Sequence, residues 1–265
     1  MTERILVLGG YGVFGSRLCA RLAGESELEV VVAGRSMARA RASCAQFGGL
    51  PYVLDIQDSA ALARALGTLK PVILIDAAGP YQAYGEDRYR IARQAITAGV
   101  HYLDLADDRS FVVGFEALDA LAREHGVCAL SGVSSVPALS CAVVEVLSAD
   151  LALCHSIDTA ILPGNRAPRG PSLVRTILSQ VGQSFRLWEA GGWRNEIVWA
   201  KPRALLLRVP GVSSLGPRWA SPFNAPDCAL FPERYRSLTV RFHAGVELRF
   251  LHASLWGASW LVRLG

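Results

Sequence analysis

Residues 4–15 have the sequence Arg-Ile-Leu-Val-Leu-Gly-Gly-Tyr-Gly-Val-Phe-Gly, and this stretch decides the fold. The apolar run Ile5–Leu8 predicts a buried strand, and the pattern over Val13–Leu22 predicts a helix. A glycine-rich turn separates the two. A strand, a tight turn and a helix at the start of the chain are typical of the first unit of a parallel α/β sheet.

Three glycines in the turn have the spacing G-x-G-x-x-G: Gly10, Gly12 and Gly15. We expect Gly10 to permit the tight turn and Gly12 to let the backbone approach a pyrophosphate, while Gly15 lets the helix pack close to the sheet. The helix N-terminus offers unpaired N–H groups and partial positive charge to phosphates. The spacing therefore predicts a dinucleotide site. The alternative is a glycine-rich turn without a ligand.

The alternation of one strand and one helix continues to about residue 130, and strands buried on both faces are typical of a parallel sheet covered by helices. The predicted strands are Ile5–Leu8, Val30–Ala33, Tyr52–Leu54, Val72–Ile75, Tyr102–Leu105 and Val127–Leu130. The predicted helices are Val13–Leu22, Met37–Phe47, Ser59–Leu66, Arg88–Ala98 and Phe115–His125. The fold class predicted for residues 1–150 is thus α/β, a Rossmann-type doubly wound parallel sheet that binds a dinucleotide.

The composition changes near Asp150. Residues 1–150 carry 13 basic and 17 acidic side chains, whereas residues 151–265 carry 14 basic and 6 acidic ones and all six tryptophans. We therefore expect a second, smaller α+β domain over 151–265, which contributes to substrate binding and dimerisation. Its predicted elements are strands at Ile157–Leu162, Ala204–Val209 and Leu238–Phe242, a hairpin of Phe185–Trp188 and Ile197–Ala200 around Gly191-Gly192, and helices at Ser172–Val181 (with Ser172 as N-cap) and Leu255–Leu264.

Composition excludes several classes of protein. The chain has 265 residues, 51% of them hydrophobic, and a net charge of +4, which argues against disorder and against nucleic-acid binding. The longest stretch without formal charge contains serines, glycines and a proline, so we predict no membrane span. Six scattered cysteines without metal-ligand spacing, and no secretory signal, indicate a cytoplasmic protein with free thiols and no metal site.

The end of the second predicted strand favours NADP(H) over NAD(H). An NAD site places a carboxylate there for the ribose hydroxyls, but this chain has Arg35 and Ser36. Arg35 suits a 2′-phosphate and the adenine face, and Ser36 offers a hydrogen bond. Arg39 and Arg41 follow on the next helix, where some of these arginines serve only as a solvated face. Asp55, after the third strand, is a further candidate for binding the cofactor.

The loops after the later strands are expected beside the cofactor, since ligands bind at the carboxyl ends of parallel strands. In the loop after the fourth predicted strand, we assign Ala77, Ala78, Gly79 and Pro80 to the cofactor site. In the glycine turn, we assign Tyr11, Val13 and Phe14 to the same site. The short-chain reductase mechanism requires Tyr-x-x-x-Lys, and neither Lys70 nor Lys201 has a tyrosine four residues earlier. That mechanism is excluded.

Together these loops resemble the saccharopine dehydrogenase-like oxidoreductases. The resemblance rests on the glycine spacing, on Ala78-Gly-Pro-Tyr81 with Tyr84-Gly-Glu86, on Ala98-Gly-Val-His-Tyr-Leu-Asp104, and on the loop Gly132–Pro137. It implies a Rossmann domain with a second α/β domain whose sheet often mediates dimerisation. Many relatives have Gly-Glu where this chain has Asp107-Asp108, and relatives are usually longer. We therefore expect the chain to be a shortened form.

The function predicted is an NADP(H)-dependent oxidoreductase that transfers a hydride to or from a C=N, C=O or C=C group of a small metabolite. Candidate catalytic residues are Tyr81 and Tyr84, as proton donors, and Asp104, which with Asp107 holds a cationic group or orients a water. Alternatively, Tyr81 only packs on the nicotinamide ribose and Asp107 or Asp108 caps the next helix. Asp76 is expected to be structural.

Two other functions are compatible with the sequence. One is a non-catalytic dinucleotide-binding or redox-sensing module, since no catalytic constellation is unmistakable. The other is a membrane-peripheral or protein-interaction role for residues 151–265, although tryptophans in a core or homodimer interface explain that composition better. The basic residues Arg166, Arg169 and Arg175 bracket a Gly/Pro loop that suits an anionic substrate, or they form an exposed basic loop.

Overall fold

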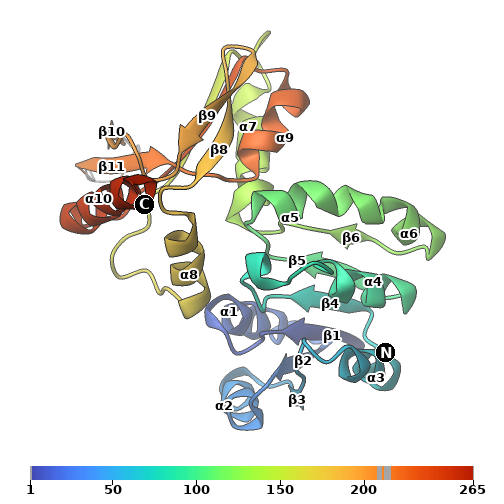
Figure 1. The fold of residues 1–265 in the computed structure, drawn as a ribbon. Coiled ribbons are helices and arrows are strands. Elements are labelled where there is room, and N and C mark those ends of the chain that lie inside the picture. Colours follow the sequence, from blue (N-terminus) through green and yellow to red (C-terminus); the bar gives the residue numbers. More distant parts are fainter. Residues whose placement is uncertain (1, 208–210, 212–215, 265) are drawn as a thin grey trace. The chain divides into compact units, whose positions relative to one another are not determined.

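The computed structural model of the chain describes residues 2–207, 211 and 216–264 (Figure 1). It divides into two compact units, Met1–Ser134 and Ser135–Gly265. The composition placed a boundary near Asp150, whereas the compact units divide before η3 (Ser135–Leu139) and α7 (Ser140–Ser148). Val144 of α7 belongs to a core cluster with Phe231 and Val240, so this helix is part of the second unit.

The first unit is a six-stranded parallel sheet with the order β3-β2-β1-β4-β5-β6. Its strands are β1 (Glu3–Leu8), β2 (Leu28–Gly34), β3 (Leu50–Val53), β4 (Ile73–Asp76), β5 (His101–Asp104) and β6 (Ala129–Leu130). Its helices are α1 (Val13–Leu22), α2 (Met37–Phe47), α3 (Ser59–Leu69), η1 (Tyr81–Ala83), α4 (Arg90–Thr97), α5 (Arg109–Gly114), η2 (Phe115–Leu118) and α6 (Asp119–Glu124). The strand order reverses between β1 and β4, the place where such sheets bind ligands. The predicted doubly wound α/β class is confirmed.

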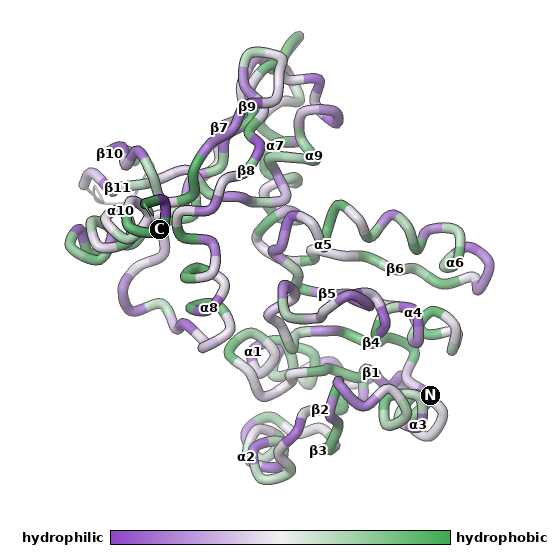
Figure 2. The backbone as a smooth tube through the Cα atoms, in the orientation of Figure 1, coloured by the Kyte–Doolittle hydropathy of each residue, from purple (hydrophilic) through white to green (hydrophobic). Residues whose placement is uncertain are grey.

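The apolar runs explain the centre of this sheet. Ile5, Val7, Val30 and Val32 are buried with Cys19 in one cluster, because central parallel strands are covered on both faces. The flanking helices alternate between hydrophilic and hydrophobic residues (Figure 2), with α1 beside α2 and with α4 in contact with both α3 and α6. At the two edges, β3 contains a proline, Pro51, and β6 is two residues long.

Two predicted helices of the first unit have the observed bounds, α1 and α2. The single helix expected over Phe115–His125 is wrong in detail: η2 covers its first turn and α6 follows. The helix α5, which precedes them, was not predicted. Asp108 is its N-cap, with the carboxylate accepting from the Phe111 N–H at 2.8 Å.

The second unit is built on a mostly antiparallel sheet with the order β10-β11-β12-β8-β9, and β7 pairs with β12 in parallel. Its strands are β7 (Ser156–Ile161), β8 (Ser184–Glu189), β9 (Gly192–Ile197), β10 (Arg203–Leu206), β11 (Pro217–Pro222) and β12 (Thr239–Ala244). Besides η3 and α7, its helices are α8 (Pro171–Gln180), α9 (Asp227–Tyr235) and α10 (Arg249–Leu264). Trp199, Phe185 and Phe242 lie in its main core cluster.

Several predictions for this unit need correction. Gly170, not Ser172, is the N-cap of α8, because Pro171 already takes the first helical position. The hairpin at Gly191-Gly192 exists, but its second strand is β9 and not Ile197–Ala200. Strand β11 and helix α9 were not predicted. Part of the strand expected over Ala204–Val209 lies outside the described residues.

Candidate functional site

The glycine turn joins β1 to α1 at the switch point of the first unit. Its left-handed residue is Gly9, with φ of 68°. Gly10 continues the hydrogen bonding between β1 and β2, since its N–H donates to the Ala33 carbonyl of β2 at 3.2 Å. A Cβ on Gly15 would collide with the Gly9 carbonyl group. The close approach of helix and turn therefore depends on Gly9 and Gly15.

Helix α1 begins with an N-terminus that no side chain caps. Gly12 is the N-cap residue, and the first turn contains no acidic residue. The first N–H groups of a helix lack intrahelical acceptors and carry partial positive charge. Val13 is half-buried and Phe14 is exposed beside them. This backbone is a ready site for a phosphate group.

The end of β2 carries cations and no carboxylate. Arg35 is exposed and, within the described part of the chain, has no acidic partner. Ser36 caps α2 by accepting from the Arg39 N–H at 3.4 Å. Asp55 follows Leu54, whose N–H donates to the Gly34 carbonyl, so this residue lies on the neighbouring strand end. The arrangement fits a phosphorylated ribose better than a free diol.

The loop after β4 contacts the glycine turn through backbone atoms. A Cβ on Gly9 would lie 2.7 Å from the Ala77 carbonyl oxygen and 2.8 Å from the Ala78 Cα. The Ala77 N–H donates to the Leu8 carbonyl at 3.0 Å, which keeps the loop beside β1. The bond between Gly79 and Pro80 is cis. The predicted cofactor residues 77–80 are thus brought next to the glycine turn.

The two candidate tyrosines lie behind this loop with their hydroxyl groups engaged. The Tyr81 hydroxyl donates to the Asp76 carbonyl at 2.6 Å and accepts from the Leu105 N–H at 3.0 Å. The Tyr84 hydroxyl donates to the Asp76 carboxylate at 2.9 Å. Both rings contact Phe111. Burial raises the pKa of each tyrosine well above its usual value.

A pair of buried carboxyl groups ends the neighbouring strands β4 and β5. Asp76 of β4 and Asp104 of β5 are register partners, and both have no exposed surface. One oxygen of Asp104 accepts from the Ala106 N–H, the Gly132 N–H and the Ser131 hydroxyl, while its Oδ2 is buried without a partner among the described residues. Burial, and then the neighbouring carboxylate, raises the pKa of Asp76 to about 7, although the Ala78 N–H opposes this shift.

The loop after β5 has mostly local contacts. Asp108 caps α5, as one of the alternatives predicted, and also accepts from the Ser110 hydroxyl at 2.6 Å. Burial raises the pKa of Asp107. A cavity of about 160 Å³ opens beside this loop, and it is lined by Tyr81, Gln82, Gly85, Arg88, Asp108, Ser110 and Phe111. Arg88 and Gln82 give this cavity donors for a polar ligand.

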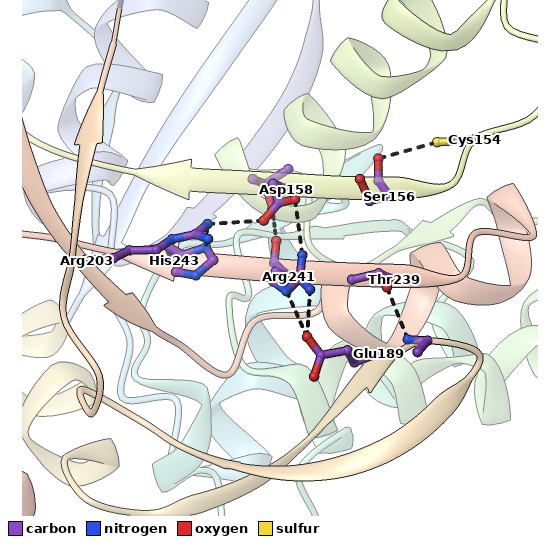
Figure 3. Close-up of polar contacts among 10 residues, drawn as sticks. Cys154, Ser156, Asp158, Glu189, Arg203, Thr239, Arg241 and His243 are labelled. Atoms are coloured by element: carbon purple, nitrogen blue, oxygen red, sulfur yellow. Dashed lines mark hydrogen bonds and ion pairs between the residues drawn. The ribbon is translucent and has the colours of Figure 1, made fainter.

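In the second unit, charged side chains form a row across three strands and the start of β10 (Figure 3). Asp158 accepts from Arg203 at 3.1 Å and pairs with Arg241, which also binds Glu189 at 2.6 Å. His243 lies under Arg203, and burial followed by that guanidinium lowers its pKa to about 4. Each positive group already has a carboxylate, so this row is balanced in charge.

The basic loop of this unit is braced by its own backbone. Arg169 donates to the carbonyl groups of Asn165 and Gly164, whereas Arg175 lies on α8 and not in the loop. Arg169 therefore serves to hold the loop backbone, and an anion site made by these arginines stays a prediction. Within the described residues, no group of three or more potential metal ligands occurs, and no helix has the length and hydrophobicity to cross a membrane.

The geometry of the first unit defines a dinucleotide-binding domain, with an uncapped helix N-terminus, a glycine turn and a cationic end of β2. Residues 5–131 match the family model described as the saccharopine dehydrogenase NADP binding domain. These residues span almost all of the first unit. Residues 5–131 thus match a saccharopine dehydrogenase NADP binding domain, which confirms the resemblance and the cofactor predicted from the sequence.

The fold is also found in a solved enzyme structure. The chain is similar to apo saccharopine dehydrogenase (L-Glu forming) from Saccharomyces cerevisiae, with a TM-score of 0.67 and 17% identity over 91% of this chain. It covers 54% of that enzyme, so it spans about half of its length. A 3-ketoreductase from Actinomadura kijaniata, solved with NADP, matches 94% of this chain and 71% of its own at 16% identity and a TM-score of 0.47. No curated protein matches the sequence significantly.

Proposed function

We propose that the chain is an NADP(H)-dependent oxidoreductase that transfers a hydride to or from a C=N, C=O or C=C group of a small metabolite. The observation that carries this proposal is the end of β2, where Arg35 is exposed beside the glycine turn and no carboxylate stands in the place of a ribose-diol acceptor. An NADP-binding domain with such a β2 end supports hydride transfer, the class of reaction that we expect from its family.

The residues divide between the two ends of the cofactor. Backbone groups of Gly10, Gly12 and Gly15 and the start of α1 suit the pyrophosphate, and Arg35 with Ser36 suits the ribose phosphate. We assign the loop of Ala77, Ala78, Gly79 and Pro80 to the nicotinamide side, because it contacts the glycine turn. When bound, NADPH supplies the hydride, and the chain has only to position and shield the acceptor.

We propose that Tyr81 and Tyr84 position this loop and do not donate a proton. The Tyr81 hydroxyl is enclosed between two backbone groups, and the Tyr84 hydroxyl is bound to Asp76. Asp104 is buried with three hydrogen bonds to one oxygen, so it supports the strand ends more readily than a substrate. The cavity lined by Arg88, Gln82 and Ser110 is the proposed place for a polar or anionic end of the substrate.

Charge reversal at Arg35 tests the cofactor assignment. We expect Arg35→Glu to weaken NADPH binding by about a hundredfold or more and to leave NADH binding within a fewfold, because only the phosphorylated ribose meets the new carboxylate. Fluorescence titration of the purified chain with both nucleotides measures this. Arg64→Glu, on the exposed side of α3, is the matched control. Equal affinity of wild type and Arg35→Glu for NADPH would contradict the proposal.

The engaged tyrosine hydroxyls favour a second candidate function, a non-catalytic NADP(H)-binding or redox-sensing module. Absorbance at 340 nm, followed with imines, ketones and enoyl compounds, separates the two functions. Turnover of any of these classes supports the oxidoreductase. Tight binding of NADPH with no oxidation across the panel supports the module.

We also propose a homodimer that uses the second unit and a cytoplasmic location. Side chains of α10 are exposed although apolar, with Phe250 at 66%, Trp260 at 50% and Leu261 at 71%. Six free cysteines support a reducing compartment. Light scattering coupled to size exclusion measures the oligomeric state directly.

A further inference from the structure

Tyr11, the second residue of the G-x-G spacing, has its side chain at the end of β2. Its hydroxyl oxygen accepts a hydrogen bond from the Ser36 N–H at 3.0 Å. The guanidinium carbon of Arg39 lies 4.6 Å from the centre of its ring. A Cβ on Gly34 would come within 2.5–2.6 Å of the outer ring atoms, so glycine at this position lets the ring lie against the β2 backbone.

These contacts fix the hydroxyl group in one place. The oxygen is used as an acceptor by Ser36, while the hydroxyl hydrogen has no acceptor among the residues that the structure describes. A phenol that keeps a free donor beside Arg35 and Arg39 is suited to an anion, because hydrogen bonds to an ionised acceptor are about twice as strong as neutral ones. A neutral ribose hydroxyl gains much less from the same donor.

We propose that Tyr11 is a specificity-determining residue for the phosphate monoester on the adenosine ribose. Its hydroxyl donates to that phosphate, and its ring holds the Arg39 guanidinium on the same side through a cation–π contact. This inference rests on the proposed NADP(H) function. It adds a neutral donor from the glycine turn to the cations at the end of β2, and it accounts for the glycine at position 34.

The variant Tyr11→Phe tests the proposal because it removes the hydroxyl and keeps the ring over Gly34 and Arg39. We expect the Kd for NADPH to rise about tenfold and the Kd for NADH to stay unchanged. Adenosine 2′-monophosphate and adenosine 5′-monophosphate, titrated as competitors, should show the same difference without the nicotinamide. Tyr89→Phe, which removes a hydroxyl bonded to the Phe111 carbonyl, is the matched control.

A second variant tests the position of the Tyr11 ring and keeps the hydroxyl group. Gly34→Ala forces the Tyr11 ring away from β2, so we expect it to weaken NADPH and spare NADH in the same way. An equal loss for both nucleotides in Tyr11→Phe means that the residue only shapes the turn, and this overturns the inference alone. An unchanged preference in both variants also overturns it. Wild-type chain that binds neither nucleotide overturns the proposed function as well.

Discussion

Asp76 is the residue through which pH acts most directly on the first unit. Its carboxyl group is completely buried beside Asp104, and its pKa is raised from 3.8 to about 7, chiefly by burial. The folded state therefore favours the protonated form. This contribution to stability is fully present below about pH 4 and is lost as the pH rises through about 7.

The expected result is a free energy of unfolding that falls from pH 5 to pH 8 in the wild type and falls less in Asp76→Asn. The amide keeps an oxygen for the Ala78 N–H and cannot ionise, so the difference between the two proteins should change by roughly 2–4 kcal/mol over this range. Urea unfolding followed by circular dichroism measures it. Asp119→Asn, an exposed carboxylate on α6, is the control. Parallel pH profiles for wild type and Asp76→Asn would show that the carboxyl is ionised throughout.

The sequence allows predictions for single residues where side-chain chemistry decides, and it leaves the backbone geometry of the turn open. The absence of a carboxylate after β2 is visible in the sequence, and it favours NADP over NAD. The sequence does not indicate which glycine of the turn is left-handed, and the structure has this conformation at Gly9. Two adjacent glycines satisfy the same steric requirement, and only the hydrogen bond from the Gly10 N–H to Ala33 distinguishes them. No sequence pattern indicates that the Oδ2 atom of Asp104 is buried without a hydrogen-bond partner among the described residues.

The stability of helix α5 depends strongly on its N-cap residue. It is only six residues long, and Asp108 accepts from the Phe111 N–H at its start. Asp108→Ala should lower the free energy of unfolding by about 1 kcal/mol, since capping side chains contribute that much and a short helix has little else. Urea unfolding at pH 7 checks this value.

The control for that cap is Asp119→Ala, which removes an exposed ion pair with Arg123 within α6. Such a pair is worth a few tenths of a kcal/mol. A loss in Asp108→Ala no larger than in Asp119→Ala would mean that α5 is held by Phe111 and Val112 in the core and not by its cap.

Elements were predictable where a cap or a glycine accompanies the periodic pattern. The two helices with correctly predicted bounds are α1, which follows the glycine turn, and α2, which Ser36 caps in the structure. Helix α9 escaped prediction because Pro232 lies inside it, and Pro usually ends a helix. Strand β9 escaped because its central residues, Arg194, Asn195 and Glu196, are polar, and no apolar alternation marks it. Antiparallel pairing with β8 holds these residues in a strand, although their own sequence does not predict one.

At the scale of the whole molecule, each unit has its own core, and every residue proposed for the cofactor lies in the first. Residues 1–134 expressed alone should therefore bind NADPH with an affinity within about twofold of the full chain. Fluorescence titration of both proteins measures this, after circular dichroism has established that the fragment is folded. A folded fragment with much weaker binding would assign part of the cofactor site to the second unit.

The edges of the parallel sheet have a consequence for how copies of this chain behave at high concentration. An edge strand with free N–H and C=O groups is a template on which another chain can add a strand and start a fibre. In this protein Pro51 removes a donor from β3, and β6 offers two residues at the opposite edge. Neither edge is a good template, so we expect the first unit to resist aggregation by strand addition.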